Sequence, residues 1–177
     1  MTHPHRSRRW MVMDACVLID FIKADRDVLR LVSRHVGPLH VISSVMLEVK
    51  DIGSENNLVA LGVIVIEPEI EDAYVAASLS GSISFEDWLC LMTAKRHGFT
   101  CVTNDRSLRK VCIQQGVSLI WGLELVAELF EADGIRIEEA EAFARRIRQA
   151  NPRHITEEIL SRFLDRIQLR VSSGLFP

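Results

Sequence analysis

The segment Trp10-Met-Val-Met-Asp-Ala-Cys-Val-Leu-Ile-Asp-Phe-Ile22 changes its apolar pattern at Asp14. Before Asp14 the residues form a short continuous apolar run, which indicates a strand. After Asp14 the apolar residues recur at the spacing of a helix, at Val17, Leu18, Phe21 and Ile22. The segment therefore predicts a strand and then a helix, with an acidic side chain at their junction.

The same alternation continues along the chain. Further short strands are predicted over 39–42, 63–66, 99–102 and 117–120. Helices are predicted over 26–35, from Ser43 or Ser44, and over 70–79, 85–97, 105–115 and 123–130, whereas 52–62 is expected to be irregular. Alternating strands and helices favour an α/β fold with a parallel sheet wrapped by helices and right-handed crossovers.

The composition changes near both ends. Residues 1–9 form a basic tail that we expect to be flexible. After Gly134, two charged amphipathic helices are predicted over 135–150 and 156–171, joined at Asn151-Pro152-Arg153. We therefore divide the chain into a tail over 1–9, an α/β domain over 10–134 and a C-terminal helical extension over 135–177.

The bulk composition narrows the class of protein. A chain of 177 residues with 48% hydrophobic residues can bury one core plus an appendage. Its four cysteines show no C-x-x-C spacing and lie in apolar runs, which fits a reducing cytoplasm. No run approaches the roughly 20 apolar residues of a membrane span. The net charge of −3 argues against broad coating of nucleic acid, although a local basic surface could still hold phosphates.

Two aspartates follow predicted strands directly. Asp14 ends the first strand, and Asp105 follows Cys101-Val-Thr-Asn104. Because the carboxyl ends of parallel strands gather at one edge, where ligands bind, both acids are expected on the same rim. Helix capping is the alternative for each. Asp87 also has this alternative, since Ser84-Phe-Glu-Asp87 fits a capping box with Glu86 pointing elsewhere.

Glu48 is expected to face the core, because it shares a helical face with Val45, Val49 and Ile52. A buried carboxylate needs a partner, which could be a bound cation or a core Lys or Arg. Four acids on one rim would repel one another unless divalent cations neutralised them. Oxygen-only ligation suits Mg²⁺ or Mn²⁺, and such sites hydrolyse phosphodiesters.

Other catalytic sites have less support in the sequence. The six histidines show no H-E-x-x-H or Cys/His spacing for zinc. The chain also has no P-loop and no G-x-G-x-x-G motif. A haloacid-dehalogenase-type phosphatase would need a second Asp where Cys16 stands. A receiver-like phosphorylation module would need a strand-end Lys that we cannot place.

Four segments resemble the PIN-domain family, more narrowly the VapC-type toxin ribonucleases or close relatives with a longer C-terminus. They are Val12-Met-Asp14-Ala-Cys-Val-Leu-Ile19, Ile42-Ser-Ser-Val-Met-Leu-Glu48-Val, Phe85-Glu-Asp87-Trp-Leu-Cys-Leu-Met-Thr-Ala94-Lys-Arg-His-Gly98 and Cys101-Val-Thr103-Asn-Asp105. The resemblance covers about positions 10 to 132. It implies a three-layer α/β/α sandwich and a cytoplasmic ribonuclease that uses Mg²⁺ or Mn²⁺, often paired with an antitoxin protein.

The resemblance also assigns roles to residues. It implies that Asp14, Glu48, Asp87 and Asp105 form the metal-binding and catalytic quartet, and that Thr103 lines the site. Arg106 is expected to meet substrate phosphate, whereas Arg109, Lys110 and Asp20 are expected on solvated surfaces. Two departures from the family pattern are Cys16, in a place that usually holds Ser, Asn or another small polar group, and the two C-terminal helices.

Two functions from different classes are carried forward. The first is a metal-dependent endoribonuclease that cleaves RNA, as the toxin of a toxin–antitoxin pair or a relative of one. The alternative is a PIN-fold RNA-binding or scaffold protein without catalysis. Amphipathic faces on the C-terminal helices further predict a homodimer.

Overall fold

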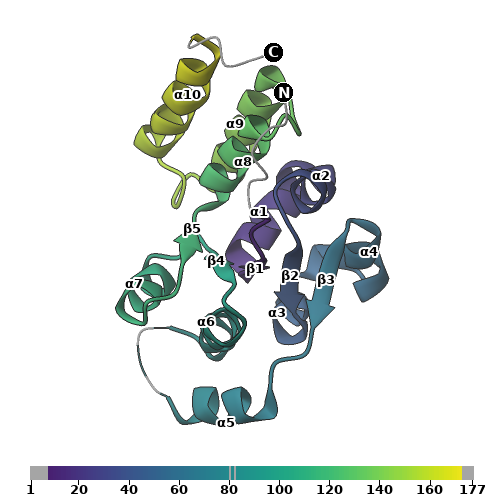
Figure 1. Cartoon of the computed structure of the whole chain (residues 1–177), viewed down its shortest axis with the longest axis vertical. Coiled ribbons are helices and arrows are strands. Elements are labelled where there is room, and N and C mark those ends of the chain that lie inside the picture. Colours follow the sequence, from purple (N-terminus) through teal and green to yellow (C-terminus); the bar gives the residue numbers. More distant parts are fainter. Residues whose placement is uncertain (1–7, 80, 82, 173–177) are drawn as a thin grey trace.

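A computed structural model describes residues 8–79, 81 and 83–172, in which helices and short strands alternate (Figure 1). The strands are β1 (Met11–Met13), β2 (Leu39–Ile42), β3 (Val63–Ile66), β4 (Thr100–Val102) and β5 (Leu119–Ile120). The helices up to β4 are α1 (Ala15–Asp25), α2 (Asp27–His35), α3 (Ser43–Glu48), the 3₁₀ turn η1 (Lys50–Ile52), α4 (Glu55–Ala60), α5 (Ile70–Ser78) and α6 (Phe85–His97). The later helices are α7 (Arg106–Gln114), α8 (Gly122–Glu131), α9 (Ile137–Ala150) and α10 (Glu157–Ser172).

The strands form one parallel sheet in the order β3-β2-β1-β4-β5. The chain builds the sheet outward from β1 to β3 and then returns to the other side of β1 to form β4 and β5. The strand order therefore reverses between β1 and β4. In open parallel sheets, the carboxyl ends of strands at such a switch point are the usual place for a ligand.

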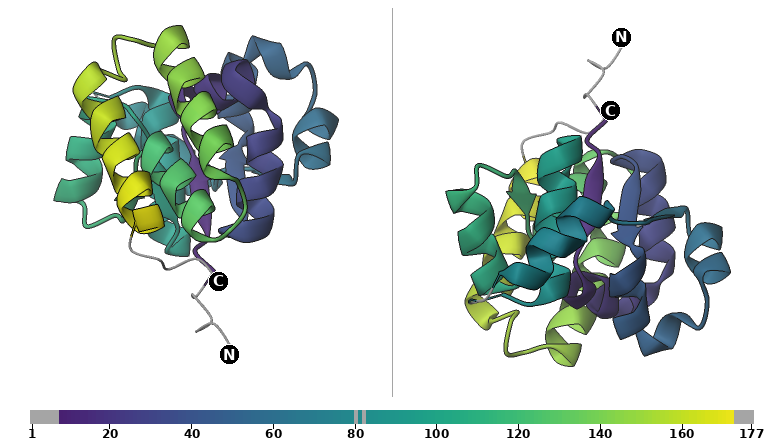
Figure 2. Two further views of the ribbon diagram at one scale, coloured as in Figure 1. Left: turned by 90° about the horizontal axis from the view of Figure 1, so that it is seen from above. Right: turned by 90° about the horizontal axis from the view of Figure 1, so that it is seen from below.

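Helices cover both faces of the sheet, which makes a three-layer α/β/α sandwich. In Figure 2, α1 and α2 lie with the C-terminal helices on one face, and α6 and α7 lie on the other. The sheet residues between these layers are almost fully buried in β1, β2 and β4. The expected α/β class and parallel sheet are confirmed.

The C-terminal helices pack directly on the α/β core. Helix α9 contacts α1 and α8, and α10 contacts α8 and α9. The rings of Phe21 in α1 and Phe143 in α9 meet edge to face, with centroids 5.1 Å apart and an interplanar angle of 88°. Both side chains belong to the same buried cluster. The apolar stripes of α9 and α10 are therefore largely covered within the chain.

One local expectation is wrong. The segment 52–62 is not irregular, because it contains α4, in which Leu58 is fully buried and the Asn57 side chain donates a hydrogen bond to the carbonyl of Ile52 at 2.6 Å. Burial of one leucine stabilises a helix that its short sequence pattern does not reveal.

Two other expectations concern the ends of the chain and the membrane. Most of the basic tail predicted over 1–9 lies outside the described residues. Among the described helices, none combines the length and the apolar character that crossing a bilayer requires.

Candidate functional site at the sheet switch point

Asp14 lies at the end of β1 and is buried, with 4% of its surface exposed. Its side chain does not cap α1. Instead, its Oδ2 accepts hydrogen bonds from Thr103 Oγ1 and from Cys16 Sγ, each at 2.9 Å. The capping alternative is therefore wrong for Asp14. Thr103 Oγ1 also accepts a hydrogen bond from the backbone N–H of Asp105 at 3.0 Å, so it joins the ends of β1 and β4.

The other two aspartates do cap helices. Asp105 Oδ1 accepts a hydrogen bond from the N–H of Leu108 at 2.7 Å at the start of α7. Asp87 accepts from the N–H of Ser84, and Ser84 Oγ accepts from the N–H of Asp87, which completes the predicted capping box. In each carboxylate one oxygen accepts the capping hydrogen bond, and the other oxygen takes no part in the cap. Capping and a second role are thus compatible at both positions.

The acids of this rim affect one another electrostatically. Burial raises the pKa of Asp14, and repulsion from Asp105 adds to the increase. Burial also raises the pKa of Asp87 to about 6, with further contributions from the charges of Asp14 and Asp105. The charges of the three aspartates therefore act on one another, although the residues come from the end of β1, from α6 and from the β4–α7 junction.

Glu48 does not face the core as expected. Helix α3 ends at Glu48, and the backbone leaves helical geometry at Val49, so the carboxylate is exposed while Val45 and Val49 are buried. The pKa of Glu48 is raised, first by partial burial of its carboxyl group and then by the charges of Glu86, Asp14 and Asp87. Glu48 thus borders the acidic rim. Glu86 faces Glu48, which corrects the expectation that it points elsewhere.

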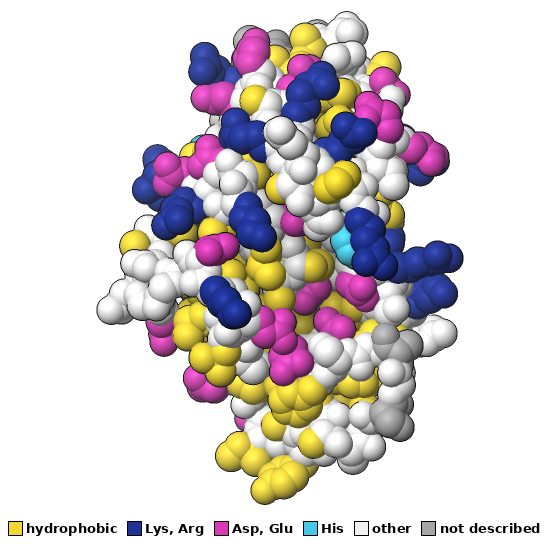
Figure 3. Space-filling model, turned by 180° about the vertical axis from the view of Figure 1, so that it is seen from behind, with side chains coloured by type: hydrophobic (Ala, Val, Ile, Leu, Met, Phe, Trp, Pro, Cys, Tyr) yellow, Lys and Arg dark blue, Asp and Glu magenta, His cyan; other side chains and the backbone are white. Residues whose placement is uncertain are grey.

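The donor set matches a hard cation only in part. Its ligand atoms would all be carboxylate oxygens, which Mg²⁺ and Mn²⁺ prefer. Within residues 8–79, 81 and 83–172, however, no three acidic, histidine or cysteine side chains lie close enough to form a ready-made metal-binding group. The face in Figure 3 shows acidic side chains gathered in the middle, with Lys and Arg side chains above and beside them. The rim is therefore acidic, and its carboxylates would have to draw together around an ion.

The basic residues after Asp105 are placed differently from the expectation. Arg106 is exposed, and Arg109 is only partly exposed. The Arg109 guanidinium carbon lies 3.6 Å from the ring centre of Trp121, and its Nε donates a hydrogen bond to the Asp105 carbonyl at 3.2 Å. Arg109 is thus built into the rim, although its position on α7 predicted a solvated side chain.

Asp20 is a further residue that the sequence pattern placed wrongly. It was expected on a solvated surface, but it is buried with 3% exposure. It accepts hydrogen bonds from Asn104 Nδ2 at 3.3 Å and from Asn151 Nδ2 at 3.0 Å. Asn104 Oδ1 accepts in turn from the N–H of Gly122 at 3.0 Å. This network fixes the loop between Thr103 and Asp105 to α1, α8 and the end of α9. Its members are 84 and 131 residues apart in sequence, so no local signal reveals it.

Comparison with known proteins does not assign the site, because no family model, curated protein or solved structure matches this chain.

Proposed function

We propose that this chain is a metal-dependent endoribonuclease of the PIN type, which hydrolyses RNA phosphodiester bonds at the acidic rim. The observation that carries the proposal is that the charges of Asp14, Asp87 and Asp105 act on one another at the point where strand order reverses, with Glu48 at the border. Each acid comes from a different segment. Unfavourable charges gathered at the usual ligand position indicate function rather than stability.

The proposed reaction adds one water across a P–O bond and leaves a phosphate monoester and a hydroxyl group. Asp14, Glu48, Asp87 and Asp105 would hold Mg²⁺ or Mn²⁺. When bound, such a cation supplies charge neutralisation and Lewis-acid catalysis of hydrolysis. Thr103 orients the Asp14 carboxylate by donating to Oδ2, and the carboxylate of Glu48 is exposed and would be accessible to a cation.

The test compares purified wild type with Asp14→Asn and Asp105→Asn on labelled single-stranded RNA, with Mg²⁺ or Mn²⁺ and with EDTA. Asn keeps the Asp105 cap, because asparagine caps helices as well as aspartate does. We expect both variants to lose at least about 100-fold in cleavage rate, the scale of a lost Lewis-acid contribution of several kcal/mol. Asp27→Asn is a matched control, because Asp27 is exposed on α2 and pairs with Arg30. Equal cleavage by wild type and Asp14→Asn would end the proposal.

A second candidate is a non-catalytic RNA-binding or scaffold protein of the same fold. The observation that favours it is that Thr103 and Cys16 both donate to Oδ2 of Asp14, which makes that oxygen less available as a metal ligand. Calorimetric titration with Mn²⁺ distinguishes the two candidates. Heat of binding that disappears in Asp14→Asn supports the nuclease, and no heat with wild type supports the scaffold.

Partners beyond RNA belong to the same proposal. An antitoxin that covers the rim is inferred from the family resemblance, and a short reading frame next to this gene would support it. A homodimer through α9 and α10 has less apolar surface available than the sequence suggested, because most of their apolar stripes pack on α1 and α8. Leu169 and Val171 remain exposed. Light scattering at micromolar concentration measures the oligomeric state directly.

A further inference from the structure

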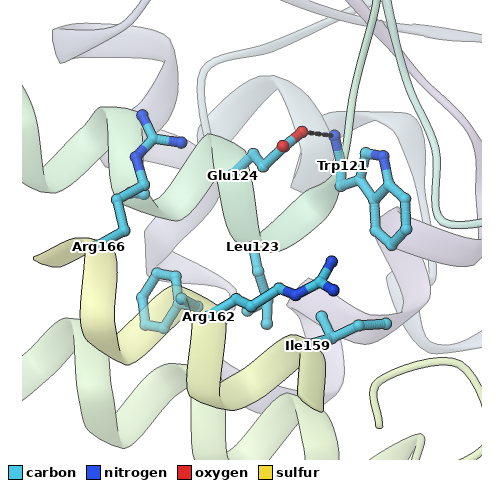
Figure 4. Close-up of a pocket in the computed structure, with 8 residues that line it drawn as sticks. Trp121, Leu123, Glu124, Ile159, Arg162 and Arg166 are labelled. Carbon is cyan, nitrogen blue, oxygen red and sulfur yellow. Dashed lines mark hydrogen bonds between the residues drawn. The ribbon is translucent and has the colours of Figure 1, made fainter.

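A pocket lies between α8 and α10, and Trp121, which precedes α8, is one of the residues that line it (Figure 4). Its volume is about 210 Å³. The residues that line it are Trp121, Leu123, Glu124, Ala127, Ile159, Arg162, Phe163 and Arg166. Pockets for drug-sized ligands span about 300–1,000 Å³, so this one has room for a single planar ring system. It combines an aromatic ring, aliphatic walls and guanidinium groups.

Trp121 connects the pocket to the rim. It directly follows β5, and the β4–β5 pairing places it beside Thr103, whose N–H donates to the carbonyl of Ile120 at 3.1 Å. Arg109 covers one face of the indole and donates to the backbone carbonyl of Asp105. The Arg109 side chain therefore links the aromatic lining of the pocket to the backbone of Asp105.

The two arginines of α10 differ in how firmly they are held. Arg166 donates to Oε1 of Glu131 through two nitrogens, Nε at 2.9 Å and Nη2 at 2.8 Å, and Glu131 is largely buried. Arg162 pairs with Glu158 one turn away on the same helix, and both side chains are more than 70% exposed. Such an exposed pair contributes little to stability, so it can be exchanged for a phosphate. In Figure 4, Arg162 extends across the pocket toward Trp121.

From this geometry we infer that the pocket is a nucleotide subsite, in which Trp121 stacks on a base of single-stranded RNA and Arg162 contacts an adjacent phosphate. This inference rests on the proposed function for the position of the scissile bond, which would lie at the neighbouring acids. It gives α10 a role in substrate binding. Aromatic stacking with a nearby cation is the usual way to hold single-stranded RNA without reading its sequence.

The test measures binding of a short fluorescent single-stranded RNA by anisotropy in EDTA, so that cleavage is not required. Replacing the ring in Trp121→Ala should raise Kd roughly 5- to 150-fold, the range for loss of one base stack. Trp121→Phe should keep most of the affinity. Trp10→Ala is the matched control, because Trp10 is half-exposed at the opposite edge of the sheet and should bind like wild type.

Arg162→Gln tests the phosphate contact without disturbing the core. The slope of log Kd against log salt should fall by about 0.7 for one lost contact to single-stranded RNA. Arg145→Gln is its matched control, since Arg145 forms the same type of pair with Glu141 on α9 and does not line the pocket. Its slope should equal that of wild type.

The outcomes separate this inference from the proposed function. RNA binding that is unchanged in Trp121→Ala and Arg162→Gln overturns the subsite and leaves the nuclease intact. The expected losses in binding, with no cleavage by wild type in Mg²⁺ or Mn²⁺, support the subsite and overturn the nuclease. A wild type that binds no RNA at all overturns both.

Discussion

The two ends of the parallel strands, called here the amino edge and the carboxyl edge of the sheet, carry different kinds of side chains. At the amino edge, the Trp10 and His40 rings stack at a centroid distance of 5.6 Å, and the His40 and Phe99 rings stack at 4.6 Å. At the carboxyl edge, burial raises the pKa of Asp87, and the charge of Asp14 adds to the increase. The amino edge is thus stabilised by packing, whereas the carboxyl edge is destabilised by burial of carboxylates and by repulsion between them. A protein retains such a cost mainly where it serves function.

The largest expected effect is at the amino edge. Phe99→Ala removes a buried ring that also stacks on His97 at 5.2 Å, and it should lower the free energy of unfolding by about 3 kcal/mol. RNA cleavage per folded molecule should not change. Urea denaturation measures the loss, with Ile113→Ala as a control that should shift stability by less than about 0.5 kcal/mol, because Ile113 is 70% exposed. A large loss of cleavage by folded Phe99→Ala would contradict the division between the edges.

The next effect is the pH dependence of the carboxyl edge. Because the folded-state pKa of Asp87 is raised from 3.8 to about 6, its protonated form suits the folded protein better. In EDTA, the protein should therefore gain stability as pH falls through 6, with this gain complete near pH 4. We expect about 1–2 kcal/mol after allowing for solvent screening of a partly exposed group. Asp14 and Glu48 shift in the same direction.

Asp87→Asn is the control for that pH profile. Its amide oxygen can still accept from the N–H of Ser84, so the helix start should survive. Thermal melts of the variant between pH 4 and 8 should be flatter than those of wild type. A wild-type protein that loses stability on acidification from pH 8 to 6 in EDTA would contradict the raised pKa of Asp87 in the folded state.

The smallest effect concerns Cys16. Cys16→Ala removes one of the two donors to Oδ2 of Asp14 and should destabilise the protein by about 1 kcal/mol. Cys16→Ser retains a donor and should stay close to wild type. Chemical denaturation of the three proteins at pH 7.5 gives the comparison. Equal stability of Cys16→Ala and wild type would mean that Thr103 alone is enough to stabilise the carboxylate.

Sequence patterns predicted what depends on neighbours along the chain. The strand end at Asp14 and the capping box of Asp87 are local features, and both were found. The burial of Asp20 was not predicted, because it results from the packing of α9 on α1. That packing buries a position that looks solvated in the sequence of α1 alone. Glu48 was assigned to the rim for a reason that proved wrong, since α3 ends too early to carry it inward.

The pocket beside Trp121 could not be predicted for a similar reason. Its walls come from α8 and α10, and their contact depends on how the C-terminal helices dock. Periodicity shows that each helix has an apolar face, but it does not show which faces meet. The order of the strands could not be predicted either, because the alternation of strands and helices predicts a parallel sheet but does not specify that β1 lies between β2 and β4.

The hydrogen bonds of Asp20 have a consequence for the newly made protein. Ribosomes synthesise the amino end first, so Asn151 emerges after Asp14, Asp87 and Asp105. Until then a buried carboxylate lacks one of its two amide partners, which is unfavourable. The loop that carries Thr103 and Asp105 is therefore anchored fully only after Asn151 has been synthesised. A site built in this way would reach its working shape only once α9 and the residue that follows it have been made.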